Sequence, residues 1–463
     1  MNRVLKTGLL GLLLLPVLAQ GQEIGLIRLA PERPKHQRDA AVWGGVEEGR
    51  FRSADMALFQ WSAGARVSGV RHRKHASRTG SLSFGQTTGK DMSSSMFLDP
   101  GYYPLDFLET GRGWKSRQDV RLEGGYVHDL GDAWAAGLQV SAQAMHVAKK
   151  QAVSHSGLGL DLQMEPTVTY VMDDEMGIAV AGILRMRTEW LRLPETDDAS
   201  AVFLDQGMRY GSGFSAGNSP FGVLEPSFGA SAILYSPEVT VGVKDVWKRG
   251  QAGDRFRYPG STVSVFAERT LEGFGVDHVY GVSYRRMRDQ LREDTPSGDQ
   301  PFTSLSDRVN RALELKYGIR LHHGAVKSVG LALEGSRWVE RSAALFPDLT
   351  KRNLGSATLS ASFSHGAFDL DVDVLAGGGL WRDRGRSRDE KTDTDCRRTE
   401  NWLRQMDYQM VPRIGAGGAL TFRVPSVQGL YLRLDGRWRR ALRLTLMGGY
   451  NRETGTFTVG YKF

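Results

Sequence analysis

The stretch GLYLRLDGRW, Gly429–Trp438, alternates between apolar and charged side chains. Leu430, Leu432 and Leu434 occupy every second position and are followed by Gly436 and Trp438, and an arginine or aspartate fills most positions between them. Successive side chains of a β-strand point to opposite faces, so this segment presents leucine on one face and charge on the other. In a soluble sheet the leucine face would be the core. In an outer-membrane barrel it would meet lipid, and the charged face would line a wet lumen. The rest of the chain decides between the two.

The same period of two recurs along the chain. Apolar residues alternate with polar or small ones in Val120–Tyr126, Leu158–Met164, Ile178–Met186, Leu313–Leu321 and Phe368–Val374. Helical spacing is nowhere sustained after the N-terminal region. The pattern therefore predicts an almost entirely β-sheet protein.

The N-terminal residues 1–19 have the features of a secretory signal peptide. Arg3 and Lys6 precede the apolar run Leu9–Leu18, and Val17–Ala19 supplies small residues for cleavage. A membrane anchor needs roughly 20 apolar residues, so this run is too short to span a bilayer. No cysteine lies near the cleavage site, which argues against a lipoprotein. We expect the mature chain to leave the cytoplasm.

Composition excludes several classes of protein. The 463 residues include a single cysteine, so an exported chain of this length must rest on a large core or a closed barrel rather than on disulfides. Cys396 stands in a polar segment without a second cysteine or a histidine nearby, and we predict no metal site and no cofactor there. The net charge of +8 is scattered along the chain, so no basic stripe suited to nucleic acid is present.

Strand length and loop length favour a membrane barrel over a sandwich or a propeller. The periodic segments run for about 9 to 15 residues, whereas a tilted membrane strand needs about 9 to 11. Tight turns alternate with long polar loops, the asymmetry that outer-membrane barrels show between their periplasmic and outer ends. The predicted turns are Asp129–Asp132, Asp173–Glu175, Ser236–Glu238, Leu271–Phe274, His322–Ala325 and Ser364–Phe368, and the predicted long loops lie at about 87–115, 191–224, 289–308 and 382–409.

The alternation of loops sets a strand count of about 16, within a range of 14 to 18. This count treats Gln428–Phe463 as one hairpin whose loop runs through Leu442–Gly455, and it places the first spanning strand near Ser77–Gln86. Residues 61–463 are then the barrel. Residues 20–60 form a polar leader that either inserts into the lumen or remains a periplasmic tail.

The chain ends in TFTVGYKF, where Phe457, Val459, Tyr461 and Phe463 share one strand face. An apolar face that ends in a terminal aromatic resembles the C-terminal signal by which the barrel-assembly machinery recognises outer-membrane proteins. We expect that machinery and outer-membrane lipid to be partners of the chain.

The first long loop carries a family resemblance. Ser93–Gly113, with the strand Val120–Val140 that follows, resembles a family of uncharacterised outer-membrane β-barrel proteins of Gram-negative anaerobes, which carry a domain of unknown function. The resemblance implies an outer-membrane barrel and supplies neither a substrate nor catalytic residues. Its prolines would stiffen the loop, and its tyrosines would line a mouth or lie at the lipid interface; packing without ligand contact is the alternative. The residues that match the motif are Asp99, Pro100, Tyr102, Tyr103 and Pro104.

An enzyme is not indicated. Outer-membrane phospholipases place a histidine and a serine two apart on one strand face, and the one such pair, His75 and Ser77, lies in a basic, turn-like segment. Energy-coupled receptors with about 22 strands and a plug domain are too large for this chain. A role as the partner of such a larger transporter stays open.

Charge placement suggests what the lumen does. Asp369, Asp371 and Asp373 share one inward face, Arg433 and Arg437 share another, and the strand Arg413–Arg423 lies between, so the two rows are about 10 Å apart. Either the rows form a field across an open pore, or long arginines reach the aspartates and close the lumen. Further predicted lumen residues are Arg185, Arg187, Arg413, Arg423 and Asp435. The sequence predicts a channel or solute-uptake component, with a closed structural or accessory barrel as the alternative.

Overall fold

The computed structural model describes residues 36–53, 55–150, 153–173, 176–192, 202–205, 211–213, 220–294, 302–342, 348–383 and 407–463. These residues form twenty strands in one sheet, and 407–410 form a helical turn. None of the described helices has the length and apolar character needed to cross a membrane. The strands are β1 (His36–Gly49), β2 (Phe59–Arg73), β3 (Ala76–Ser95), β4 (Asp106–Asp129), β5 (Trp134–Lys149), β6 (His155–Val171), β7 (Gly177–Arg192), β8 (Val202–Asp205), β9 (Gly211–Gly213), β10 (Phe221–Tyr235), β11 (Val239–Ala252), β12 (Phe256–Glu272), β13 (Val276–Asp294), β14 (Phe302–Leu321), β15 (Val326–Ser342), β16 (Asp348–His365), β17 (Phe368–Asp383), β18 (Arg413–Arg423), β19 (Leu430–Ala441) and β20 (Asn451–Lys462).

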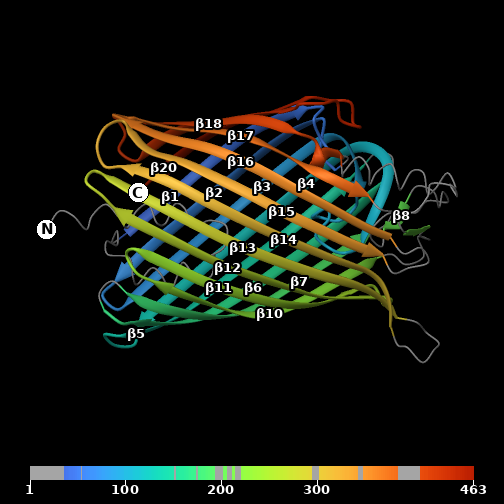
Figure 1. Cartoon of the computed structure of the whole chain (residues 1–463), viewed down its shortest axis with the longest axis horizontal. Coiled ribbons are helices and arrows are strands. Elements are labelled where there is room, and N and C mark those ends of the chain that lie inside the picture. Colours follow the sequence, from blue (N-terminus) through green and yellow to red (C-terminus); the bar gives the residue numbers. More distant parts are fainter. Residues whose placement is uncertain are drawn as a thin grey trace.

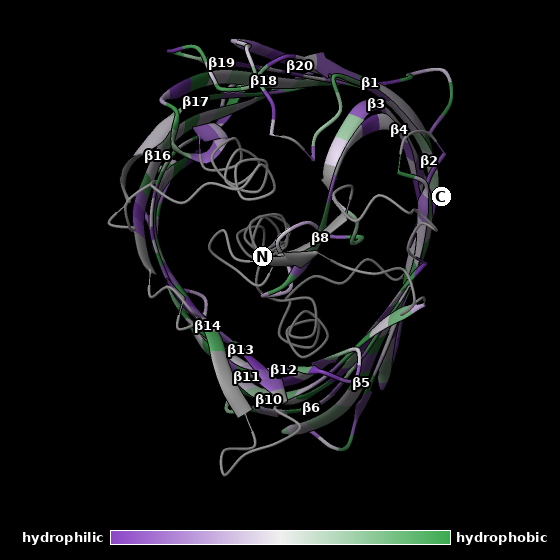
Figure 2. Ribbon diagram, turned by 90° about the vertical axis from the view of Figure 1, so that its right-hand side faces the viewer, coloured by the Kyte–Doolittle hydropathy of each residue, from purple (hydrophilic) through white to green (hydrophobic). Residues whose placement is uncertain are grey.

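Eighteen of these strands close into an antiparallel barrel. Each pairs with its sequence neighbours, β7 pairs with β10, and β1 closes the ring by pairing with both β2 and β20. The short strands β8 and β9 do not join the wall. β8 pairs with the start of β4 and lies inside the outline of the ring (Figure 2). The predicted all-β barrel is confirmed, and the strand count is the upper limit of the predicted range rather than 16.

The two additional strands lie near the N-terminus. β1 occupies His36–Gly49, inside the segment that we expected to be a leader, and the barrel therefore starts before residue 61. β2 likewise precedes the expected first spanning strand. β1 is hard to recognise because glycine and acidic residues dilute its apolar face, although Val42 and Val46 are both more than half exposed on the barrel exterior. The predicted signal peptide, residues 1–19, lies outside the described residues.

The two ends of the barrel differ, as predicted. All six predicted tight turns connect strands at one end, called here the short-turn end, where β1 begins and β20 ends. The described strand ends that flank the four predicted long loops all lie at the opposite end, called here the long-loop end (Figure 1). Much of the predicted loop 87–115 is strand, because β3 continues to Ser95 and β4 begins at Asp106. β19 and β20 form the predicted hairpin, and Leu442, Leu444 and Leu446 lie in its loop.

The barrel is apolar outside and charged inside. On β7, the outward residues include Leu184, which is 56% exposed, and the residues that alternate with it include the buried Arg187 and Glu189. The same arrangement holds on β19, where Leu434 is 57% exposed and faces away from Asp435. A soluble barrel would have the opposite arrangement, because charged side chains are almost never buried without partners.

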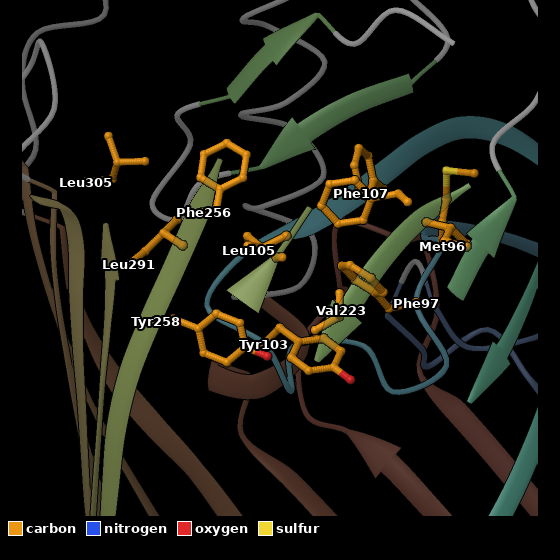
Figure 3. Close-up of a cluster of buried hydrophobic side chains, with 13 residues drawn as sticks. Met96, Phe97, Tyr103, Leu105, Phe107, Val223, Phe256, Tyr258, Leu291 and Leu305 are labelled. Atoms are coloured by element: carbon orange, nitrogen blue, oxygen red, sulfur yellow. The ribbon is translucent and has the colours of Figure 1, made fainter. Parts of the chain in front are cut away.

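The largest buried apolar cluster lies inside the long-loop end rather than through the whole barrel. It joins the connection between β3 and β4 to residues from β7 and β10–β14, as Figure 3 shows for most of its side chains. Its members are Met96, Phe97, Tyr103, Leu105, Phe107, Leu191, Phe221, Val223, Ala252, Phe256, Tyr258, Leu291 and Leu305. This cluster holds a loop against the inner wall.

Candidate functional site in the lumen

The candidate site is built around residues 96–105, called here the inward loop, which connect β3 and β4. Its tip is a tight turn in which the Tyr102 amide donates to the Asp99 carbonyl oxygen at 3.1 Å. Pro100 supplies the fixed φ that such turns favour, and Gly101 adopts a φ of +73°, a left-handed conformation that glycine tolerates without strain. The sequence Asp-Pro-Gly-Tyr therefore reverses the chain and presents two tyrosines.

Aromatic packing holds one side of the inward loop. The rings of Phe97 and Tyr103 pack edge to face with centroids 5.0 Å apart, and Tyr103 reaches the buried Tyr258 of β12 at 5.9 Å (Figure 3). Phe107, at the start of β4, packs on Phe221 of β10 at 4.7 Å. Burial is the main reason that the pKa of Tyr103 is raised, so this tyrosine stays neutral and acts as a hydrogen-bonding group.

Asp99 ties the inward loop to the near wall. Its carboxylate pairs with Arg117 of β4 at 3.1 Å and with Arg187 of β7 at 2.5 Å. Burial raises the pKa of Asp99, but the two guanidiniums outweigh it, so the pKa lies below its usual value. The guanidinium of Arg187 also lies 3.9 Å from the ring centroid of Tyr102, a cation–π contact. The Leu98 amide donates to Glu189 Oε1 at 2.7 Å.

Tyr102 and Arg308 tie the inward loop to the far wall. The Tyr102 hydroxyl donates to Glu225 Oε1 of β10 at 2.6 Å. Arg308 of β14 donates to the carbonyl oxygens of Gly101 at 2.9 Å and Tyr102 at 3.0 Å. Burial and the adjacent Glu225 raise the pKa of Tyr102, which keeps its hydroxyl a donor.

A chain of alternating charges links these far anchors. Glu225 meets Lys248 of β11 at 3.3 Å, Lys248 meets Asp289 of β13 at 3.0 Å, and Asp289 meets Arg308 at 2.8 Å. Lys248 and Asp289 reach each other across β12 because Gly260 stands between them in register. A Cβ at Gly260 would lie 2.5 Å from Asp289 Oδ1 and 2.6 Å from Lys248 Cε. The glycine therefore makes the charge chain continuous.

These contacts carry the inward loop across the lumen. Around the ring from β4 come β5, β6, β7, β10, β11, β12, β13 and β14, so Arg308 lies eight strands from β4 in a ring of eighteen. That is nearly half the circumference. A loop that leaves β3 and β4 and is bound by Arg308 must traverse the interior.

A buried ion pair braces the base of the inward loop. Lys149 of β5 pairs with Glu109 of β4 at 2.6 Å, and both side chains are fully buried. The Lys115 ammonium donates to the Ser95 carbonyl oxygen at 2.5 Å. Removing one partner of a buried pair leaves an uncompensated charge, so these contacts hold the loop in its inward direction.

The predicted charged rows lie on β17, β18 and β19 as neighbouring strands, and their side chains share the inward face. Arg433 pairs with Asp435 on its own strand at 2.8 Å, and Arg423 pairs with Asp369. Within the described part of the chain, Asp371 and Asp373 form no ion pair with Arg433 or Arg437. The predicted ladder that would close the lumen is therefore absent from these strands.

Asp373 and Arg437 instead line a depression of about 340 Å³ on the inner wall. Gly417 separates them in register, and Glu47 of β1 and Arg452 of β20, themselves an ion pair, line the same depression. Among the described residues no ion pair joins Asp373 to Arg437, although both line this depression.

The structure brings together two predicted sets that the sequence presented separately. The loop residues Asp99, Tyr102 and Tyr103 contact the predicted lumen residue Arg187, and the Arg185 guanidinium lies 5.9 Å from the Tyr102 ring centroid. The tyrosines lie inside the barrel, not at a lipid interface.

The remaining predicted residues fall in three places. Pro104 is buried in the inward loop, and Pro100 is exposed at its tip. Arg413 faces inward and donates to the Tyr408 carbonyl oxygen at 3.4 Å. Phe457, Val459 and Tyr461 share the outward face of β20, and Phe463 is largely exposed after its end.

The charge chain of Glu225, Lys248, Asp289 and Arg308 was not predicted. Period-two alternation could have assigned each of these residues to the inward face. Alternation could not have predicted the register between neighbouring strands, which brings these four side chains together.

Comparison with known proteins assigns no family to the chain. No family model matches the chain, and no curated protein matches it. The FrpB iron transporter from Neisseria meningitidis (F3-3 variant) matches at 8% identity over 96% of this chain and 83% of its own, with a TM-score of 0.45. The siderophore receptor PiuA from Acinetobacter baumannii matches at 7% over 92% and 82%, with a TM-score of 0.46. OccK9 (OpdG) of Pseudomonas aeruginosa matches at 9% over 92% and 97%, with a TM-score of 0.39. The identities are too low to transfer the role of any residue, and the family resemblance of Ser93–Gly113 stays a prediction.

Proposed function

We propose that this protein is an outer-membrane channel for small polar solutes, narrowed at its long-loop end by the inward loop. The observation that carries the proposal is the attachment of this loop to Arg308, eight strands away around the ring. A loop fixed across a charged lumen sets the width of the bore and the side chains that a solute meets.

The exterior supports a membrane location. Exposed aromatic residues gather toward both ends of the strands, and aliphatic residues lie between them, as in the aromatic girdles of outer-membrane barrels. Trp134, Tyr170 and Phe368 lie near the short-turn end, and Trp61, Trp190 and Trp247 lie toward the long-loop end. With both barrel ends on the short-turn side, that side would be periplasmic. The apolar outward face of β20 suits recognition by the barrel-assembly machinery.

The interior supports passage of polar rather than apolar solutes. Inward side chains carry both signs of charge, and several acidic and basic groups stay apart, as Asp373 and Arg437 do. A wall of this kind stabilises hydrated ions and polar molecules in preference to apolar ones. No single substrate follows from these residues.

A closed barrel that serves a structural or accessory role, for example beside a larger transporter, is the second candidate. The buried aromatic cluster of Tyr103, Phe107 and Tyr258 favours it, because this cluster fills the space between the inward loop and one wall. The two candidates differ in whether ions cross the purified barrel.

Conductance in planar bilayers tests the proposal. The wild-type protein is expected to give discrete channels, and a variant in which residues 98–103 are replaced by glycine and serine is expected to give larger ones. The control variant replaces residues 425–428 of a short-turn connection in the same way and should conduct like the wild type. Silence in both the wild type and the loop variant, with the barrel folded, would favour the closed accessory barrel.

A further inference from the structure

A basic patch interrupts the outer surface of the barrel near the long-loop end. Arg311 of β14, Arg337 and Arg341 of β15, and Lys351 of β16 line a depression of about 310 Å³. These side chains face outward, because they alternate in step with exposed apolar residues of the same strands such as Leu313 and Leu333. They therefore lie on the surface that would face lipid, not in the lumen.

Like charges stand directly opposite one another in this patch. Arg311 is the register partner of both Arg286 on β13 and Arg337 on β15, so three arginines occupy one row across three strands. Like charges placed opposite each other in a sheet are destabilising. An anion bound between them would offset that repulsion.

The protein supplies little negative charge to this patch. Among the described residues that line the depression, Asp307 is the single carboxylate, and Arg288 donates two hydrogen bonds to it at 3.2 and 3.1 Å. Among the residues that the structure describes, no carboxylate forms an ion pair with Arg311, Arg337, Arg341 or Lys351. The patch therefore retains its positive charge for a ligand.

The surface next to the patch identifies the ligand as an amphiphile. Toward the short-turn end, the row of arginines gives way to Tyr284 and Leu313, which are register partners, and then to Leu315, Leu331 and Leu333. These apolar residues are all more than a third exposed on the same face. A free phosphate would use only the cations, whereas a lipid would place its phosphate on the cations and its acyl chains along the leucines.

We propose that this patch binds the phosphorylated headgroup of a lipid in the outer leaflet of the membrane. The site rests on the membrane location in the proposed function but not on the open pore. Basic clusters beside an apolar membrane surface recognise anionic headgroups in this way, with each cation near the surface adding to the affinity. Arginine suits the role because its planar fork matches phosphate oxygens.

Native mass spectrometry of the detergent-purified barrel tests the site, with bisphosphorylated lipid A as the probe. The variant combines Arg311→Gln, Arg337→Gln and Arg341→Gln. The matched control combines Arg192→Gln, Arg249→Gln and Arg440→Gln, which are exposed outward arginines of the same end but on strands that are not neighbours. The affinity of the variant is expected to fall about tenfold or more, whereas the control stays close to the wild type.

Three results would overturn the site, each in a different way. Equal binding by the variant and the wild type, with both barrels still shifting on gels when boiled, would remove the site and leave the membrane location intact. Equal retention of zwitterionic phosphatidylcholine would show that the cations do not select the headgroup. Full displacement of the lipid by millimolar inorganic phosphate would make the patch a site for free anions. Loss of the gel shift in the wild type would overturn the membrane location itself.

Discussion

Arg308 of β14 donates a 2.9 Å hydrogen bond to the carbonyl oxygen of Gly101, at the tip of a loop that starts and ends on the other side of the barrel. The same guanidinium also pairs with Asp289 at 2.8 Å, and this ion pair fixes the orientation of the guanidinium toward the loop. A charged donor held in this way gives stronger hydrogen bonds than a neutral one. Arg308 therefore anchors the tip of the inward loop to β14.

Arg308→Gln should weaken the attachment of the inward loop to β14. Hydrogen bonds to charged groups contribute about 1.5 to 3 kcal/mol, so their loss should shift the loop toward detached states and raise both the mean conductance and the open-channel noise. Single-channel recordings in planar bilayers measure both. Arg249→Gln is the control, because Arg249 of β11 lies toward the same end of the barrel but is exposed on the outward face. Conductance unchanged by Arg308→Gln would mean that the loop does not limit the bore.

Gly260→Ala should break the charge chain that positions Arg308. The new methyl group would have to displace Lys248 or Asp289, whose ion pair crosses this glycine. Overpacking of this kind typically costs about 1 to 3 kcal/mol. Urea unfolding followed by the gel shift measures it. Gly124→Ala is the control, because a Cβ at Gly124 meets nothing within 4 Å; equal losses from the two substitutions would contradict the role of Gly260.

Acid should release the near anchor of the loop. The pKa of Asp99 lies below its usual value of 3.8, since Arg187 and Arg117 outweigh the effect of burial. The anchoring is therefore fully present above about pH 3.8 and is lost as the pH falls through the lowered pKa of the folded state. Wild-type conductance should rise as the pH falls below this value. Asp99→Asn should abolish that step; a step of the same size in the variant would assign it to another group.

Alternation along a single strand predicted the faces of the barrel but not the partners across it. Every leucine of the opening stretch faces outward and Asp435 faces inward, because these assignments need only the two-residue period. The pairing of Arg187 with Asp99, by contrast, joins residues 88 apart and depends on the direction in which a loop folds. The apolar residues Phe97 and Leu105 gave no period that would indicate that the loop turns into the lumen.

Alternation along a single strand also failed to give the correct strand count, because it does not reveal which strands pair with each other. β1 has few apolar residues on its outward face, and its Trp43 packs against Gly64 of β2 on the other face. A strand that closes a barrel is stabilised by ladder hydrogen bonds to both neighbours, so it needs less hydrophobic character than a free-standing amphipathic strand. The partners of β1 are β2 and β20, and the pairing with β20 joins the two ends of the chain, so it can be recognised only in the folded structure.

Leu434→Arg tests the assignment of faces. Leu434 lies on the outward face of β19, and an arginine in the lipid-facing band costs about 2 to 4 kcal/mol near the bilayer midplane. Arg437→Leu, on the inward face of the same strand, should fold with little loss. Urea titration of both variants in lipid vesicles provides the measurement. Similar stabilities would mean that lipid does not contact the leucine face.

Asp371→Asn combined with Asp373→Asn should change ion selectivity without changing conductance. Asp371 accepts a hydrogen bond from the Ser362 hydroxyl at 2.7 Å, and Asp373 lines the inner depression beside Gly417. Neither carboxylate forms an ion pair among the described residues, so no salt bridge is broken when they become amides. The wall loses negative charge and keeps its shape.

The measurement is the reversal potential under a salt gradient. The double variant should lose preference for cations, whereas Arg437→Gln, which removes a positive charge from the same depression, should shift the reversal potential in the opposite direction. An increased leak in the double variant would instead indicate that these aspartates help to close the lumen. Identical potentials in all three proteins would show that ions pass elsewhere, and the inward loop rather than this wall would then set the selectivity.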